Sequence, residues 1–374
     1  MRRSPSSPFR TACWGTPPWK IDFRPPAKPL PSSVDFAVIG GGFTGLAAAA
    51  WLRQLSPHAT VAVFEAGKIG AGSSGHTGGL ALAESAAGDL PGLGDVLAGF
   101  HRRLRTLRVD CDLHLPGVYE LSHAHCRASS SICWKDGGDL RVSKHVPGGS
   151  IDPGKLVSGL SRAAHRLGAH IFENSPLQGI AFDRPLRLLV NGAEISAGAA
   201  LVATNSMSLD LSSLERRADP KFTLAVATEP LSKAQLSALG LASRRPFYTA
   251  DLPYLWGRLR ENNSLVLGSG LVHLENWSDL HRIDIRKGEA AQRLAHLVAR
   301  IRGFHPALRR VKFTHRWGGP ILMSKDWKPI FERHAHSDDV LVLGAYTGHG
   351  VALSTYLGCW SAEVLLKKKR LPSW

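Results

Sequence analysis

A glycine-rich turn between a short apolar strand and an alanine-rich helix constrains this chain more than any other part of its sequence. The turn lies in residues 36–52, which read FAVIGGGFTGLAAAAWL. Gly40 permits a tight turn, Gly42 lets backbone N–H groups approach a phosphate, and Gly45 lets the helix pack closely on the strand. The N-terminus of the helix favours negative charge. The segment therefore predicts a site for the pyrophosphate of a dinucleotide.

A second apolar strand, which ends in an acid, follows the helix. Residues 60–65 read TVAVFE, and Glu65 stands at the separation from the glycines that a ribose contact requires. A glycine turn without a ligand is the alternative. However, strand, helix, second strand and acid occur here in the order of a Rossmann-type unit. We therefore expect Glu65 to bind ribose hydroxyls.

A second glycine-rich segment comes directly after this acid. It covers residues 66–80 and reads AGKIGAGSSGHTGGL. An NAD-binding unit has no obvious use for such a loop. The arrangement resembles the FAD-dependent oxidoreductases of the D-amino-acid oxidase, glycine oxidase and sarcosine oxidase family, in which the loop lines the flavin. The resemblance implies that FAD is the cofactor.

Further segments that resemble this family follow in the family's order over most of the chain. They are LVATN at 201–205, which is similar to the gamma-glutamylputrescine oxidase-like branch, WGGP at 317–320, Asp326 with Pro329 and Ile330, and VLVLGAYTGHGV at 340–351. In the family's pattern, the strand at 169–173 and the turn after it also carry backbone contacts to the adenine end of FAD, at about Leu177. With the two glycine-rich segments and the acidic strand end, the predicted cofactor contacts are Gly40, Gly42, Phe43, Thr44, Gly45, Glu65, Ala66, Gly72, Ser73, Ser74, His76, Thr77, Gly78, Leu177, Thr204, Asn205, Gly344, Gly348, His349, Gly350 and Val351.

The last of these segments predicts a second strand-to-helix turn on physical grounds as well. An apolar strand and several glycines precede a helical pattern over residues 351–366, so the first amides of that helix are free to face a ligand. In the family this helix end stabilises negative charge on the reduced flavin. A C-terminal packing helix with a glycine entry is the alternative.

The order of predicted elements indicates an α/β protein. The resemblance implies a Rossmann-type FAD-binding domain, glutathione-reductase-like and of the D-amino-acid oxidase type, interleaved with an α+β substrate domain that contains an antiparallel sheet. We expect the FAD-binding domain to comprise residues 34–100, 150–217 and 316–374, and the substrate-binding domain to comprise residues 101–149 and 218–315. Residues 1–33 are expected to form an extended N-terminal arm, whose Trp14 and Trp19 dock on the surface.

The composition of the chain argues against several other classes of function. The 46 Lys and Arg residues against 30 Asp and Glu residues give a formal charge of +16, but the basic residues are dispersed and no nucleic-acid motif accompanies them. We therefore expect no nucleic-acid partner. No apolar run is long enough for a membrane span, and no secretory signal is evident, so a cytoplasmic location is expected. Neither a metal site nor a disulfide framework is expected from the scattered Cys13, Cys111, Cys126, Cys133 and Cys359.

The resemblance also implies the reaction. It is oxidation of the C–N bond of a small-molecule amine or amino acid, such as a secondary amine, a D-amino acid or a polyamine derivative, by hydride transfer to flavin N5. An amine that arrives unprotonated needs no catalytic base. The electrons then pass to O2 or to another acceptor; Val266, where monomeric sarcosine oxidases carry a lysine, favours another acceptor. The alternatives are a 2-hydroxy-acid or polyol dehydrogenase on the same fold, or a non-catalytic flavin-binding subunit. The oligomeric state is open.

His76 has two interpretations. Residues 71–80 resemble the segment of dimethylglycine and sarcosine dehydrogenases whose histidine bonds covalently to the flavin. In the commoner family pattern, the residue at a similar place only contacts the cofactor. Both roles stay open for His76. A cysteine link of the monomeric sarcosine oxidase kind is not expected, because no thiol occurs near Gly319.

Three residues are predicted to act at the reacting centre: Tyr254, Arg258 and His349. Tyr254 and Arg258 alternate with Trp256 along a predicted strand and share one face, where Arg258 would hold a substrate carboxylate. A solvated arginine beside core aromatics is the alternative. His349 would stabilise the reduced flavin, or would only cap a helix. Three further aromatic residues are predicted as pocket walls or as core: Trp317, Tyr346 and Tyr248.

Overall fold

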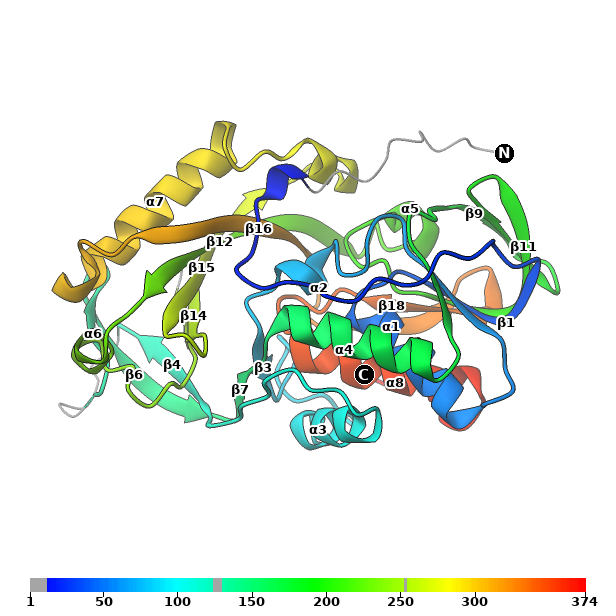
Figure 1. Ribbon diagram of the computed structural model, residues 1–374, viewed down its shortest axis with the longest axis horizontal. Helices are drawn as coiled ribbons and strands as arrows, with labels where there is room; N and C mark the ends of the chain where they lie inside the picture. The colour runs from blue at the N-terminus through cyan, green and yellow to red at the C-terminus, as the bar shows by residue number, and fades with distance from the viewer. Residues whose placement is uncertain (1–11, 124–129, 252–253) are drawn as a thin grey trace.

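The structure is a computed structural model that describes residues 12–123, 130–251 and 254–374. Two units lie side by side along the long axis of the molecule, and each is built on an eight-stranded sheet (Figure 1). A small two-stranded sheet, β3 (Leu80–Leu82) with β7 (Gly148–Ser150), lies where the two units meet. The α/β class expected from the sequence is confirmed.

The sheet of the first unit has parallel strands at its centre. Its order is β17-β18-β11-β1-β2-β8, and β9 and β10 extend it from β11. β1 pairs in parallel with both β11 and β2, and β2 is buried along its whole length. Strands buried on both faces are typical of nucleotide-binding units. The strands are β1 (Ser33–Ile39), β2 (Val61–Phe64), β8 (His170–Phe172), β9 (Leu177–Ala181), β10 (Leu186–Val190), β11 (Ala193–Val202), β17 (Ile330–His334) and β18 (Ser337–Gly344).

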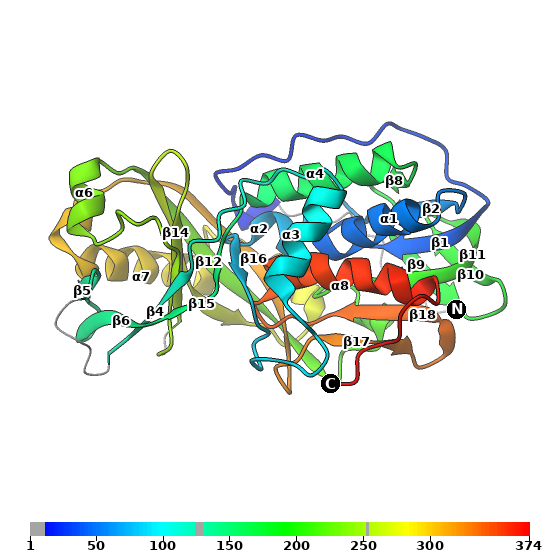
Figure 2. The same cartoon turned by 90° about the horizontal axis from the view of Figure 1, so that it is seen from below.

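Helices α1, α4 and α8 pack together against one face of this sheet, and α3 lies beside α8 (Figure 2). The four alanines at 47–50 of α1 are fully buried, and their small side chains let the sheet and the neighbouring helices approach closely. A Cβ on Gly358 of α8 would lie 2.4 Å from the Thr44 carbonyl oxygen of α1. The helices are α1 (Phe43–Leu55), α2 (Ser73–His76), α3 (Val96–Thr106), α4 (Pro153–Arg166), α5 (Leu209–Ser212) and α8 (Gly350–Leu365).

The sheet of the second unit is antiparallel except where β13 meets β4. Its order is β16-β12-β15-β14-β13-β4-β6-β5, and α7 (Gly288–Phe304) packs on one face of it (Figure 1). α6 is Lys233–Ala238, and 3-10 helices cover Ala12–Trp14, Trp277–Arg282 and Pro306–Leu308. The strands are β4 (Val118–Ser122), β5 (Cys133–Lys135), β6 (Asp139–Val146), β12 (Ala218–Pro230), β13 (Phe247–Thr249), β14 (Leu255–Leu259), β15 (Ser264–His273) and β16 (Phe313–Ser324).

Two boundaries differ from those expected from the sequence. β16 pairs with β12 from Ser324 to Phe313, so the second sheet extends past the boundary expected at residue 316. Leu104, Leu107 and Cys111 are buried in the core of the first unit, so the boundary expected at residue 101 lies too early. The pattern of apolar residues identifies both elements, but it does not show which core each element joins.

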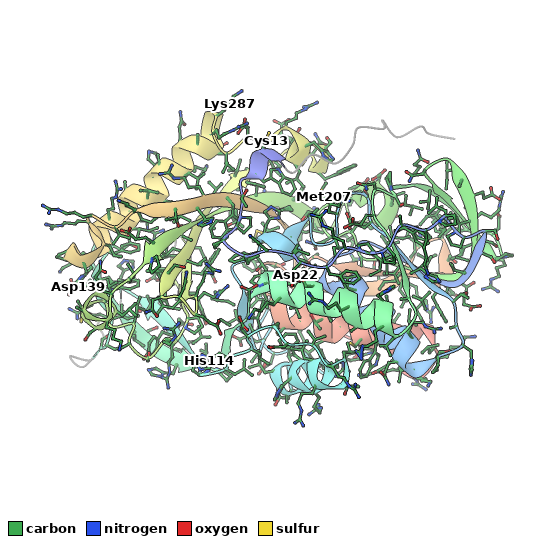
Figure 3. The ribbon with its side chains drawn as sticks, viewed as in Figure 1. Cys13, Asp22, His114, Asp139, Met207 and Lys287 are labelled. Carbon is green, nitrogen blue, oxygen red and sulfur yellow. The ribbon has the colours of Figure 1, made fainter. Side chains whose placement is uncertain are left out.

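The N-terminal arm enters the interior instead of docking on the surface. Trp14 is fully buried and Trp19 is 7% exposed, so the surface position expected for these two residues is wrong. Farther along, the arm runs beside α4 (Figure 3), where the Asp22 N–H donates to Ser158 Oγ at 3.0 Å and the Asp22 carboxylate pairs with Arg162 at 2.6 Å. Residues 1–11 of the expected arm lie outside the described residues.

The four cysteines in the described ranges are free thiols, and Cys126 lies outside those ranges. Within the same ranges, no helix has the length and the apolar character that crossing a membrane requires. The high positive charge is spread over both units, and many of the basic side chains pair with carboxylates on the surface, as Arg187 does with Asp183 at 2.5 Å.

Candidate functional site

A cavity of about 1310 Å³ lies between the two units. One end is lined by the glycine turn before α1, by Glu65 and by the loop that contains α2. The other end is lined by strands of the second sheet, including Tyr248 and Trp256. A cavity at the meeting of two units, with polar groups at one end and aromatic groups at the other, has the features of a binding site for a large ligand.

The turn before α1 is built so that only glycine fits at two positions. Gly40 has a φ of +112°, and a Cβ there would lie 2.6 Å from the Ala203 carbonyl oxygen. A Cβ on Gly45 would lie 2.0 Å from the Gly40 carbonyl oxygen. Gly42 at the N-cap offers no side chain to the first turn of α1, while the Phe43 N–H donates to Ser74 Oγ at 2.9 Å. Amides of this turn are therefore available to an anion in the cavity.

Glu65 lies directly after β2 and is held by two backbone amides. Its Oε2 accepts from the Gly41 N–H at 2.7 Å, and its Oε1 accepts from the Gly67 N–H at 2.8 Å. Burial raises the pKa of the Glu65 carboxyl, and these two hydrogen bonds oppose the rise. A carboxylate has about four lone-pair directions. The two that remain suit a pair of ribose hydroxyls.

Asn205 ties together three segments that lie far apart in the sequence. Its Oδ1 accepts from the Ala345 N–H at 3.0 Å, and its Nδ2 donates to Ser73 Oγ at 3.2 Å. Ser73 Oγ in turn donates to the Pro320 carbonyl oxygen at 2.7 Å. Asn205 has a φ of +50°, a conformation that asparagine tolerates better than most residues. The LVATN, WGGP and second glycine-rich segments therefore meet on one wall of the cavity.

Two hydroxyl groups on the cavity wall lack a partner within the described part of the chain. Thr204 Oγ1 and Ser354 Oγ are both buried without a hydrogen bond. A buried hydroxyl without a partner is unfavourable, so both groups fit a cavity that holds a polar ligand. Tyr346 also lines the cavity, and its hydroxyl bonds to Thr44 Oγ1 at 2.8 Å.

The structure brings most of the predicted cofactor contacts to this cavity. Gly45 and Gly344 do not line it: Gly45 packs against the Gly40 carbonyl, and Gly344 packs against Asn205. The predicted contacts that line the cavity are Gly40, Gly42, Phe43, Thr44, Glu65, Ala66, Gly72, Ser73, Ser74, His76, Thr77, Gly78, Leu177, Thr204, Asn205, Gly348, His349, Gly350 and Val351.

Comparison with known proteins decides which ligand this arrangement serves. The model of the family described as FAD-dependent oxidoreductase (DAO) matches residues 35–364. The chain belongs to the family of FAD-dependent oxidoreductases. Its cofactor is accordingly FAD, and the residues fit that group. The glycine turn lines the cavity, Glu65 has free lone pairs, and the Thr204 and Ser354 hydroxyls lack partners in the described ranges.

Individual relatives agree with this assignment. The chain is 25% identical over 377 residues to the gamma-glutamylputrescine oxidoreductase of Escherichia coli (strain K12), covering 88% of this chain and 83% of that protein. It is 22% identical to the glycine oxidase of Bacillus licheniformis, covering 91% of this chain and 95% of that protein. The crystal structure of glycine oxidase from Geobacillus kaustophilus has the same fold, with a TM-score of 0.73, 18% identity, and coverage of 91% of this chain and 96% of that one.

His76 lines the cavity on the loop that contains α2. Its imidazole is neutral. Its Nδ1 is 2.9 Å from the Gly72 carbonyl oxygen, which only accepts, so Nδ1 carries the proton and Nε2 is the free nitrogen. Burial lowers the pKa of His76. The ring of Trp14 meets the His76 ring edge-on at 5.5 Å. Both interpretations of His76, a covalent bond and a polar contact, would use Nε2.

His349 lines the cavity at the start of α8, and both roles predicted for it stay open. It occupies the N-cap position of α8, and its Nδ1 lies 3.3 Å from the Thr347 carbonyl oxygen. Burial lowers the pKa of His349, and the positive end of α8 also disfavours a charged imidazole there. A cationic His349 is thus disfavoured, while the first amides of α8 lie at this wall.

The predicted carboxylate ligand, Arg258, lies outside the cavity. Tyr254 and Trp256 line the cavity, on the face that strand alternation predicts. Arg258 lies at the far end of that face. Its side chain is only 4% exposed, because Trp19 of the arm covers it. Its Nε donates to the Gly78 carbonyl oxygen. Val266, its neighbour on β15, is fully buried in the same cluster. Strand periodicity does not show that the arm covers this end of the sheet.

Sequence reasoning missed the acidic groups at the end of the cavity that the second sheet lines, which is called the substrate end below. Glu84 and Glu120 both line the cavity there, and Tyr248 donates to Glu120 Oε2 at 3.0 Å. Burial and the negative charge of Glu120 raise the pKa of Tyr248, so its hydroxyl stays protonated. No local pattern marks these carboxylates, because they reach the cavity only through the pairing of distant strands.

The stability of the apoprotein is expected to fall as the pH drops below about 6.5, the ordinary histidine pKa. Burial lowers the folded-state pKa of both His76 and His349, so the unfolded chain binds more protons below that pH and gains stability relative to the folded protein. Glu65, whose pKa is raised, acts in the opposite direction at lower pH. Melting temperatures between about pH 7.5 and 5.5 check this. The fall in melting temperature between these pH values should be smaller in His349→Asn than in the parent. An equal fall would contradict a lowered pKa for His349.

Proposed function

We propose that the protein oxidises the C–N bond of an amine that carries a second cationic group away from the reacting nitrogen. The observation that carries this proposal is the lining of the substrate end of the cavity, which combines aromatic rings with carboxylates and excludes Arg258. Two similar proteins are named for related substrates, gamma-glutamylputrescine and glycine. Their names support oxidation of an amine or amino acid in general, and the lining favours the amine.

The floor of the substrate end is a row of side chains across the second sheet. Trp256 pairs laterally with Tyr248, and Tyr248 pairs laterally with Glu120. Laterally paired residues project to the same face of a sheet. Trp256 lies over Gly268, where a Cβ would meet its ring at 1.9 Å. The row therefore presents two aromatic rings followed by a carboxylate, a sequence of groups that suits a chain ending in an ammonium.

The charges at this end leave one carboxylate for a ligand. Lys144 pairs with Glu120 at 3.2 Å, so Glu120 already has a cation. Glu84 has no hydrogen-bond or ion-pair partner in the described ranges. Arg293 also lines the cavity but pairs with Glu289 at 2.6 Å. A substrate ammonium near Glu84 would complete the charge balance, whereas a substrate carboxylate would add repulsion.

The reaction needs no base from the flavin end when the amine arrives unprotonated. When bound, FAD accepts the hydrogen and the two electrons of the substrate C–H bond. His76 and His349 are neutral, and Tyr254, whose pKa burial raises, keeps its proton at neutral pH. With an unprotonated amine, the protein contributes by orienting the substrate and excluding water.

A matched pair of substrates tests the proposal. One is a linear N-methyl amine that ends in a second ammonium, and the other has the same length but ends in a carboxylate. The ammonium compound should have a kcat/KM at least about tenfold higher, because only it complements Glu84. Equal values, or a preference for the carboxylate, would contradict the proposed substrate class. Bleaching of the flavin by 2-hydroxy acids alone would replace amine oxidation with the dehydrogenase alternative.

Acid precipitation separates the two roles of His76. If the imidazole only contacts the flavin, all the yellow colour stays in the supernatant after the protein is precipitated. If Nε2 is bonded to the flavin, the colour stays in the pellet, and His76→Ala moves it to the supernatant. Before acid is added, native protein is reduced by substrate without oxygen and then exposed to air. Fast return of the oxidised flavin band indicates O2 as the acceptor, and slow return indicates another acceptor.

A further inference from the structure

Three buried side chains donate hydrogen bonds to the backbone of the flavin-lining loop. Trp19 Nε1 donates to the Gly75 carbonyl oxygen at 2.7 Å, and Trp317 Nε1 donates to the His76 carbonyl oxygen at 3.0 Å. Arg258 Nε donates to the Gly78 carbonyl oxygen. We propose that Trp19, Trp317 and Arg258 are positioning residues that set the place of residues 75–79, and with them the affinity for FAD. Residues 75–79 are called the tethered loop below.

The three donors come from separate parts of the chain and support one another. Trp19 belongs to the N-terminal arm, Trp317 to β16 and Arg258 to β14. The rings of Trp19 and Trp317 meet edge-on with centroids 5.4 Å apart, and the Arg258 guanidinium lies 5.6 Å from the centroid of the Trp19 ring. Their exposed fractions are 7%, 0% and 4% respectively. The cluster is therefore shielded from water.

Arg258 is a buried charge with few contacts besides the tethered loop. Burial lowers its pKa to about 10, so it remains charged at neutral pH. Its Nη2 finds no hydrogen-bond partner in the described part of the chain. Because the charge is buried, loss of either of its remaining contacts is costly. Those contacts are the Gly78 carbonyl and the face of Trp19.

The tethered loop carries the residues that line the flavin end. His76, Thr77 and Gly78 line the cavity, while the carbonyls of Gly75, His76 and Gly78 point to the three donors. Trp256 blocks movement on the side of the substrate, because a Cβ on Gly78 would lie 2.0 Å from its ring. Loss of one donor frees a segment that must be ordered before the flavin can bind, and the entropy of ordering it then opposes binding. The arm before β1 is thus part of the cofactor site, although it does not line the cavity.

The test uses Trp19→Phe, which keeps an aromatic ring and removes the Nε1–H donor. The apoprotein of this variant should bind FAD about tenfold more weakly than the parent, as judged by quenching of flavin fluorescence during titration. Trp134→Phe is the matched control, because Trp134 is also buried and its Nε1 donates to the Leu239 carbonyl at 3.1 Å, within the core of the second unit. Its affinity for FAD should equal that of the parent, even if its melting temperature falls.

Two results would overturn the inference. One is an unchanged FAD affinity in Trp19→Phe, and the other is an equal loss of affinity in both variants, which would reflect general destabilisation. Arg258→Met provides a second measurement if Trp19→Phe does not fold, because Arg258 also donates to the tethered loop and does not line the cavity. It too should weaken FAD binding about tenfold. The inference concerns the cofactor alone. It therefore stands or falls separately from the substrate class proposed above.

Discussion

Replacement of Gly45 by alanine is expected to yield a protein that loses its flavin during purification. A Cβ at this position would lie 2.0 Å from the Gly40 carbonyl oxygen, which belongs to the backbone of the turn and has no rotamer to escape into. The turn must move, and its amides then no longer converge on the pyrophosphate. We expect the affinity for FAD to fall by about 100-fold or more. Absorbance of the purified variant and FAD titration of its apoprotein measure the effect.

The helix propensities of glycine and alanine predict the opposite effect on α1. Alanine favours a helix over glycine by roughly 1 kcal/mol, so propensity alone would stabilise α1 in the variant. Gly303→Ala is the matched control, because Gly303 also lies in a helix, and a Cβ there meets nothing within 4 Å. The control should keep its flavin and its stability. Full retention of FAD by Gly45→Ala would show that the turn does not hold the pyrophosphate as described.

Replacement of Glu84 by glutamine is expected to lower kcat/KM for the doubly charged amine by about tenfold or more. The change removes the carboxylate that has no other partner in the described ranges, and it keeps the shape of the side chain. A monoamine of the same length has no second cation, so its kcat/KM should stay the same. Steady-state kinetics with both amines measure the difference between the two losses.

Glu261→Gln controls for a general change in surface charge. Glu261 is exposed in the turn between β14 and β15 and does not line the cavity. Neither amine should respond to this change. An equal loss for both amines in Glu84→Gln would mean that Glu84 acts on the fold or on the flavin, and the cationic subsite would then have to be abandoned.

The parts of this protein that could be predicted from sequence are those that local geometry fixes. The turn at Gly40 and Gly45 admits no other residue, and Glu65 must follow β2 directly, so these residues identify a dinucleotide site without any knowledge of the rest. The second strand-to-helix turn at Gly348 and Gly350 follows the same logic.

The parts that could not be predicted depend on contacts between distant segments. Alternation along β14 places Tyr254, Trp256 and Arg258 on one face, but the arm determines which of them meets the cavity. Glu120 reaches the substrate end only because β4 joins β13 in the same sheet. The neutral state of His349 follows from burial by residues that its own segment does not reveal. These are tertiary effects, and no single segment contains the information that specifies them.

Anaerobic titration of the purified protein with the doubly charged amine, followed in the visible absorption band of the flavin, tests the central claim most directly. The account predicts yellow protein whose visible band disappears as the amine is added. Yellow protein that no amine bleaches, or folded protein that stays colourless after incubation with excess FAD, would contradict it.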